Sequence, residues 1–248
     1  MAKKREQDPE QQNTVAVSER RVGILQRTAK EVRNHRVMVR LLSLMLTMLI
    51  FLVGTIYVVS ILYKRSGTLT ISLDKYEMTQ YGLSLSESRE MTHMTSHLNA
   101  KISEKMTNIS EKSISPNVGM IDGEHNGRDY IAYTFYLQNA GEHEVTYDYN
   151  VIMSNVTNGL DEAIRLRLYV NDLPTTYAKT RSDGKGPEPG TKEFYSNDIM
   201  TNGRIYNLPA GGVTKYTIVL WLEGNDPDCI DWLIGGTIKI EMTMSVAQ

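Results

Sequence analysis

The stretch YIAYTFYLQN, residues 130–139, has the spacing of a β-strand and decides the fold class of the chain. Its bulkiest apolar side chains recur at every second position, and a strand turns alternate side chains to opposite faces. One face would carry Ile131, Tyr133, Phe135 and Leu137. The pattern predicts a strand that buries one face in a hydrophobic core.

Five more stretches have the same alternation or are rich in β-branched and aromatic residues. They are TLTISLD (68–74), VTYDYNVIM (145–153), AIRLRLYVN (163–171), VTKYTIVLWLE (213–223) and GTIKIEMTMSV (236–246). In the third of these stretches, Arg165 and Arg167 alternate with apolar residues and would point outward.

Turn-forming pieces separate these stretches: NAGEHE, SNVTNGLDE and SDGKGPEPG, the last at residues 182–190. Their glycines and prolines do not continue strand pairing. Short strands with turns between them predict that residues 66–248 form an all-β domain, an antiparallel β-sandwich of jelly-roll type.

One stretch of this domain breaks the pattern. In residues 86–110, SESREMTHMTSHLNAKISEKMTNIS, apolar residues recur at mostly helical spacing. A helix packed on a sheet edge is one interpretation. The many Ser and Thr residues equally favour an irregular crossing.

Charge divides the chain into three parts. Residues 1–40 carry ten Lys or Arg against five Asp or Glu, residues 41–63 carry none of these, and residues 64–248 carry 17 against 24. The near-neutral total therefore combines a basic arm with an acidic body.

The uncharged part, LLSLMLTMLIFLVGTIYVVSILY, predicts a transmembrane helix over residues 41–63. At about 1.5 Å per residue it reaches roughly 35 Å, enough for a hydrocarbon core of about 30 Å. The alternatives are the buried helix of a soluble protein and a cleaved signal peptide. An uncleaved anchor is favoured, because the apolar run is long and has no good Ala-x-Ala site.

Basic residues predict the orientation of this helix. Six Lys or Arg lie in the twenty residues before it and three in the twenty after it. The amino terminus should stay in the cytoplasm and the acidic body should lie outside the cell membrane as a single-pass extracellular domain.

The basic arm itself has two parts. Residues 1–17 are polar without a period, which predicts a disordered cytoplasmic arm. In residues 18–40, apolar residues at helical spacing alternate with bases, which predicts a basic amphipathic juxtamembrane helix on anionic lipid. Nucleic acid is disfavoured as a partner because the same bases already set the topology.

The stretch WLEGNDPDCIDWLIGG, residues 221–236, looks most like a chemical site. A calcium ion could bind Glu223, Asp226, Asp228 or Asp231, since calcium takes hard oxygen ligands from loops. The spacing differs from an EF-hand, and Asn225-Asp226-Pro227-Asp228 has the composition of a turn. A structural turn is therefore favoured over a metal site.

Other candidates for chemistry are weak. His93 and His97 are four apart and would share a helical face, but Met94 stands where a zincin has its glutamate. Cys229 has no basic neighbour in sequence to activate it. With no nucleophile elbow, P-loop or dinucleotide motif, the sequence predicts no catalytic residue, no cofactor and no enzymatic activity.

Four stretches carry a resemblance to a known family. They are DGEHNGRDYIAYTFYLQNAG, LDEAIRLRLYVND, YAKTRSDGKGPEPGTKEFYS and YTIVLWLEGNDPDCIDWLIGGTIKIEM. Over roughly residues 67–246 the chain resembles surface proteins of Gram-positive bacteria, distantly similar to the TasA and camelysin type.

The resemblance implies a jelly-roll domain outside the cell and, as in the best-known members, assembly into matrix fibres by strand donation. Camelysin is described as a metalloprotease, but this chain has no HExxH motif. It also has a charged arm and an anchor in place of the family's cleaved signal peptide.

The sequence thus predicts a membrane-anchored cell-surface protein with a non-enzymatic structural, adhesive or matrix-assembly role. Its partners would be the membrane and, by edge-strand addition, further copies or other surface proteins. The alternative is a ligand-binding module for cell-wall glycan, using Tyr136, Tyr169 or Tyr206, or for calcium. A hydrolase is a third class, but no metal or nucleophile can be assigned to it.

Overall fold

The computed structural model describes residues 33–59, 68–74, 76, 80–101 and 106–247. The chain divides into two compact units, Met1–Leu62 and Tyr63–Gln248. The expected arm at residues 1–17 and most of the expected juxtamembrane helix lie outside the described residues.

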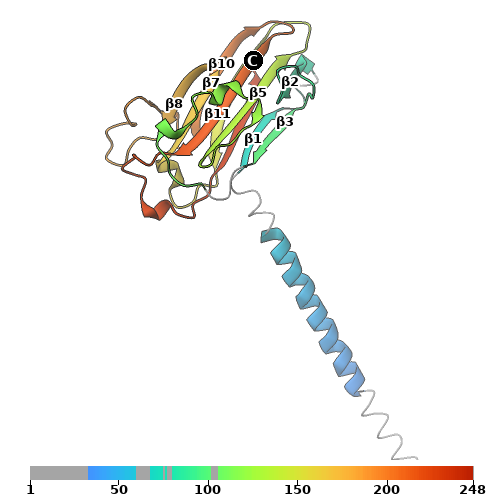
Figure 1. Cartoon of the computed structure of the whole chain (residues 1–248). Coiled ribbons are helices and arrows are strands. Elements are labelled where there is room, and N and C mark those ends of the chain that lie inside the picture. Colours follow the sequence, from blue (N-terminus) through green and yellow to red (C-terminus); the bar gives the residue numbers. More distant parts are fainter. Residues whose placement is uncertain (1–32, 60–67, 75, 77–79, 102–105, 248) are drawn as a thin grey trace, which may run out of the picture. The chain divides into compact units, whose positions relative to one another are not determined.

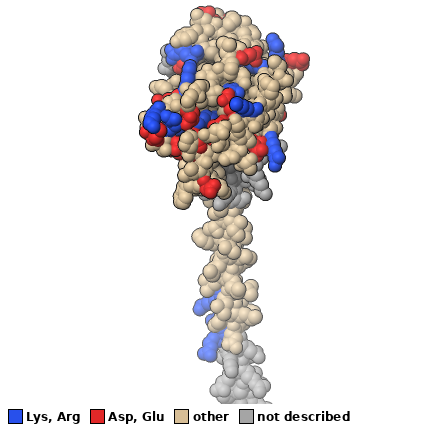
Figure 2. Space-filling model, turned by 60° about the vertical axis from the view of Figure 1, so that its left-hand side comes forward, with Lys and Arg blue, Asp and Glu red and all other residues tan. Residues whose placement is uncertain are grey.

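The first unit contains one continuous helix, Arg33–Val59, which is long and apolar enough to cross a membrane. The expected boundary at residue 40 falls inside this helix, while residues 60–63 of the expected span lie outside the described ranges. In Figure 2, the visible surface of this helix carries no charged side chains except for Lys or Arg near one end.

In the second unit, the described strands form two sheets (Figure 1). Sheet A has the strand order β10-β6-β12-β1-β3. Its strands are β1 (Thr68–Leu73), β3 (His97–Lys101), β6 (Val145–Ser154), β10 (Ile199–Leu208) and β12 (Lys239–Val246).

Sheet B has the order β2-β5-β11-β7-β8-β9, and β4 also pairs with β5. Its strands are β2 (Leu83–Ser86), β4 (Gly123–Glu124), β5 (Tyr130–Asn139), β7 (Ile164–Val170), β8 (Leu173–Ala178), β9 (Lys192–Glu193) and β11 (Val213–Leu222). The six strands expected from the sequence are all present, with small differences at their ends.

The expectation of purely antiparallel pairing is wrong at two places. β1 pairs in parallel with β12, and the short β9 pairs in parallel with β8. Parallel neighbours need a long connection. β1 and β12 are the first and last described strands of the unit, so nearly the whole domain forms the connection between them.

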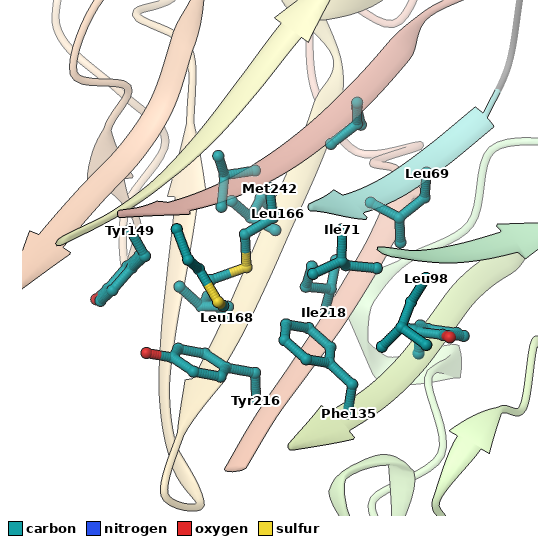
Figure 3. Close-up of a cluster of buried hydrophobic side chains, with 14 of the residues drawn as sticks. Leu69, Ile71, Leu98, Phe135, Tyr149, Leu166, Leu168, Tyr216, Ile218 and Met242 are labelled. Carbon is teal, nitrogen blue, oxygen red and sulfur yellow. The ribbon is translucent and has the colours of Figure 1, made fainter. Parts of the chain in front are cut away.

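The two sheets share one hydrophobic core, built from the alternate side chains that the sequence pattern selected (Figure 3). Phe135 of sheet B stacks on Tyr216 at 5.3 Å between ring centroids, and Tyr149 of sheet A meets Tyr216 edge-on at 5.6 Å. The hydroxyls of Tyr147 and Tyr216 are 2.8 Å apart and satisfy each other inside this core. Burying these aromatic rings stabilises the contact between the sheets.

The helix considered for residues 86–110 is wrong. The described part contains β3 and an isolated bridge between Leu85 and Thr95 instead. Serine side chains compete with helical hydrogen bonding here, since Ser86 Oγ and Ser88 Oγ accept bonds from the amides two residues onward.

The outer face of sheet B is covered by residues 107–122, which we name the cover segment. Ile114 and Val118 of this segment pack with Val219 and Trp221 of β11 in a second, smaller core. The described residues of this unit also contain four single-turn 3₁₀ helices: η1 (Glu111–Ser113), η2 (Val118–Met120), η3 (Leu160–Glu162) and η4 (Asp231–Leu233). The first two belong to the cover segment.

Candidate functional site

The acidic loop, residues 223–236, lies between β11 and β12 and contains η4. Trp221, at the end of β11, is almost fully buried under the cover segment. Its indole Nε1 donates a hydrogen bond of 2.9 Å to Glu223 Oε2. The first carboxylate of the loop therefore accepts the hydrogen bond that the indole N–H of a buried tryptophan needs.

Glu223 also holds the cover segment in place. Its Oε2 accepts a 3.0 Å bond from the amide of Glu111, while Oε1 accepts from the amide of Asn225 at 3.3 Å. The backbone repeats the link, because the amide of Ile109 donates to the carbonyl of Leu222 at 2.9 Å. Glu223 is thus occupied by bonds between two segments far apart in sequence.

Asp226 forms a buried ion pair with Arg165 of β7, and each side chain is only 2% exposed. Asp226 Oδ1 also accepts the amide of Asp228 at 2.8 Å, as in an Asx turn. Arg165 lies on the outer face of sheet B, opposite the shared core, as the strand pattern predicts, but it is buried there because the acidic loop folds over this side of the sheet. A buried arginine needs such a partner to be tolerated.

The remaining two carboxylates have different surroundings. Asp228 accepts hydrogen bonds from the amide of Ser182, at 2.9 Å, and from its hydroxyl. This fastens the expected turn at 182–190 to the acidic loop. Asp231 lies in the first turn of η4 and is exposed.

The four calcium candidates therefore do not converge on a shared point. Glu223, Asp226 and Asp228 each bond to a different protein group. In the described ranges, no group of three or more His, Cys, Asp or Glu is arranged to hold a metal ion. These contacts are those of a structural turn.

The histidine candidates are also separated from any site. His93 and His97 are both exposed, and His97 begins β3, so the expected common helical face does not exist. The ring nitrogens of His125 lie 2.8 and 2.6 Å from the carbonyl oxygens of Gly123 and Val118. This histidine links Val118 of the cover segment to Gly123 of β4.

Cys229, the cysteine of the acidic loop, is half-buried and free. Its Sγ accepts a hydrogen bond of 3.4 Å from Asn108 Nδ2 of the cover segment. The described contacts of this thiol contain no base that would activate it as a nucleophile.

Sequence reasoning missed an open groove of about 520 Å³ on sheet B. Its lining residues are Glu111, Arg167, Tyr169, Pro174, Thr175, Thr176, Gly190, Thr191 and Lys192. Arg167 lies over the Trp221 ring at 5.3 Å from its centroid and forms an ion pair with Glu111. The strand pattern placed Arg167 outward, but nothing in the sequence predicted that Glu111 would face it.

The three tyrosines considered for glycan binding have unequal environments. Tyr136 is buried, and its hydroxyl donates to Asp122 Oδ1 at 2.5 Å. Burial and this carboxylate raise the pKa of Tyr136 above its ordinary value. Tyr169 is half-buried in the groove, and Tyr206 is 71% exposed on β10.

Comparison with known proteins gives little. No family model and no curated protein matches this chain. Two structures of a β-glucosidase from Kluyveromyces marxianus are weakly similar. One, in complex with glucose, has 13% identity and a TM-score of 0.25, covering 71% of this chain and 18% of its own. The other, selenomethionine-labelled, has 10% identity and a TM-score of 0.25, covering 64% and 17%. At this TM-score the similarity supports no statement about fold or function.

Proposed function

We propose that the protein is a single-pass, membrane-anchored bacterial cell-surface protein with a non-enzymatic structural, adhesive or matrix-assembly role. Its amino terminus lies in the cytoplasm, and its two-sheet domain is a jelly-roll-like β-sandwich outside the cell. The observation that carries this proposal is the helix Arg33–Val59, whose apolar side chains are uncovered by the described protein on all sides.

An uncovered apolar helix is unfavourable in water but suits a bilayer. Large side chains such as Leu46, Met48 and Phe51 are each more than half exposed. Each Leu, Ile, Val or Phe contributes about −0.3 to −0.6 kcal/mol to insertion near the helix centre. Lipid would cover this surface where protein does not.

The polar side chains of the helix also suit a lipid environment. The hydroxyls of Ser43, Thr47 and Thr55 each donate to the carbonyl three residues earlier, at 2.8–2.9 Å. Bonds within the helix remove the cost of burying an unpaired polar group in hydrocarbon. Arg33, Arg36 and Arg40 at the amino-terminal end support a cytoplasmic amino terminus.

Alkaline carbonate extraction and protease protection test the anchor and its orientation. We expect the full chain to stay in the membrane pellet, and protease added to intact cells to remove the two-sheet domain. Release into the carbonate supernatant would reject the anchor. Protection of the domain in intact cells would reject the orientation.

Self-association is the binding mode that the sheet edges suggest. β10 ends sheet A with ten residues, and an edge strand presents unpaired backbone groups to a neighbour. Two register shifts against β6 interrupt this edge, which limits the length of chain that could pair with it.

Cysteine cross-linking on cells tests association at β10. In a Cys229→Ser background, Tyr206→Cys places a thiol on β10, and Ser245→Cys places one at an exposed position of the central strand β12 as the matched control. We expect cross-linked dimers from the β10 variant and far fewer from the control. Equal yields would indicate random collision and reject the edge as the contact.

The groove on sheet B favours a second candidate, a module that binds cell-wall glycan. Tyr169 offers an aromatic face and the threonines offer hydroxyls, a combination suited to sugar rings. Pull-down on purified cell wall tests it with Tyr169→Ala and, away from the groove, Tyr206→Ala. Loss of binding in the first variant alone would support the groove, and equal binding by both would remove this candidate.

Calcium, the other ligand considered, is tested by thermal melting with EDTA and then with millimolar calcium. A ligand that binds the folded state raises the melting temperature. We expect no change, because three of the four carboxylates already bond within the protein. A rise that is lost in an Asp228→Ala and Asp231→Ala double variant would restore the metal site.

A further inference from the structure

The acidic loop exposes three large apolar side chains that its structural bonds do not explain. Ile230, Trp232 and Ile234 are 59%, 74% and 76% exposed. Between them, Leu233 is buried and holds η4 against the domain. We name these three exposed residues the apolar tip. Clustered exposure of large apolar side chains is typical of surfaces that contact another apolar phase.

The topology fixes where the apolar tip lies in the domain. β12 begins at Lys239, shortly after the acidic loop, and runs parallel to β1, with Leu69 opposite Ile240. The start of β12 and the start of β1 are therefore at the same end of sheet A. In Figure 1, η4 and the start of β1 both lie at the lower end of the domain.

The same end of the domain is covalently close to the apolar helix. Residues 60–67 alone connect Val59, the last described helical residue, to Thr68 at the start of β1. Eight residues at about 3.3–3.6 Å each span at most about 30 Å. If the helix crosses a bilayer, this short connection keeps the same end of the domain near the bilayer surface, so the domain can contact the bilayer without first diffusing to it.

We propose that the apolar tip docks into the outer surface of the bilayer that holds the helix. Tryptophan is enriched at membrane interfaces, where its ring lies at the level of the headgroups. The inference rests on the proposed function, because it requires the helix to cross a membrane. The exposed carboxylate of Asp231 lies within the tip and would be repelled by anionic lipid, so we expect the docking on neutral lipid.

The two tryptophans of the chain allow a direct test. Trp221 is 1% exposed, whereas Trp232 is in the apolar tip. The full chain is reconstituted at low protein density in phosphatidylcholine vesicles that contain brominated phosphatidylcholine, which quenches nearby tryptophan. We expect the wild type to lose roughly half of its tryptophan emission, and Trp232→Phe to lose little, if Trp232 lies at the interface.

A matched control moves the exposed tryptophan to the other end of the domain. Tyr206 is 71% exposed and follows Ile205 on β10. Ile205 pairs with Tyr147, and Tyr147 pairs with Val246. Tyr206 therefore lies near the end of β12, whereas the apolar tip lies near its start. In the Trp232→Phe background, and at a protein density too low for copies to associate through β10, Tyr206→Trp should remain open to aqueous iodide and unaffected by brominated lipid. Trp232 of the wild type should show the opposite behaviour.

Three outcomes would overturn the proposal. Trp232 could be as open to iodide as the control tryptophan. It could be quenched only in vesicles with anionic lipid. Trp232 could be shielded from iodide but not quenched by brominated lipid. If this shielding disappeared when the protein was diluted with lipid, a second copy of the chain, and not the bilayer, would cover the apolar tip. Failure of the anchor is separate, because the chain would then not float with the vesicles at all.

Discussion

The outer faces of the two sheets are built differently. In β6 of sheet A, buried side chains alternate strictly with half-exposed ones, as the sequence predicts. In β5 of sheet B, seven consecutive residues, 131–137, are buried, so this strand is covered on both faces. The cover segment makes the difference, and it turns a two-layer arrangement into a locally three-layer one.

The sequence already distinguishes a strand that is open on one face from a strand that is covered on both faces, by how its apolar residues are spaced. β6 reads VTYDYNVIMS, with polar residues at alternate positions, whereas β11 contains the run TIVLWL. Near-continuous apolar runs are typical of strands buried on both faces. β7 reads IRLRLYV and alternates like β6, so its sequence gives no such sign that the acidic loop covers Arg165.

The largest predicted effect concerns the ion pair beneath the acidic loop. Asp226→Ala should lower the free energy of unfolding by about 3–5 kcal/mol, because it leaves the buried Arg165 without a partner. Urea unfolding of the full chain in detergent measures this. The double variant Arg165→Met and Asp226→Leu should recover much of the loss, and a double variant as unstable as the single would show that the pair is not the cause.

The second prediction compares apolar side chains on the two outer faces. Ile114→Ala removes a buried residue of the cover segment and should cost about 2–5 kcal/mol. Ile152→Ala, on the outer face of β6, should cost much less because Ile152 is only half-buried. Equal losses would mean that the cover segment adds no more to stability than an open sheet face.

The third prediction concerns the core that both sheets share. Tyr147→Phe should cost about 1–3 kcal/mol at neutral pH, because it removes the hydroxyl partner of the buried Tyr216. Unfolding by urea measures it, with Tyr206→Phe on the exposed part of β10 as the control.

The loss should depend on pH in a defined direction. Burial raises the pKa of Tyr147 from 10.0 to about 12. The unfolded state then loses this proton first, so the contribution is complete below pH 10 and is lost as the pH rises towards about 12. The difference between wild type and Tyr147→Phe should therefore shrink above pH 10, and a constant difference would contradict the assignment.

The smallest predicted effect is at the open face of sheet A. Arg204 of β10 donates to both oxygens of Asp148 of β6, at 2.6 and 2.7 Å, and this bond lowers the pKa of Asp148. Its contribution is present above the ordinary aspartate pKa and is lost as the pH falls through the lowered value. Asp148→Asn should shift the unfolding midpoint only slightly, because exposed pairs are weak.

Salt distinguishes the two ion pairs. The small shift of Asp148→Asn should vanish at high ionic strength, since exposed charges are screened. The loss in Asp226→Ala should persist there. If both respond equally to salt, the Arg165–Asp226 pair is open to solvent and the contrast between the two faces fails.

The sequence by itself determined the elements that depend on local periodicity. The six strands, their inward faces and the apolar helix follow from which side chains must leave water. It also determined that residues 225–228 form a turn, since Asn, Asp and Pro have local backbone preferences that need no distant partner. The function proposed for this architecture is still a prediction.

Only the tertiary structure decided which outward positions are truly exposed. The burial of Arg165 depends on Asp226, sixty-one residues later, and that of Trp221 depends on the cover segment. The parallel pairing of β1 with β12, which places the apolar tip, joins the two ends of the domain. Contacts between residues far apart in sequence leave no local period, and therefore only the folded chain reveals them.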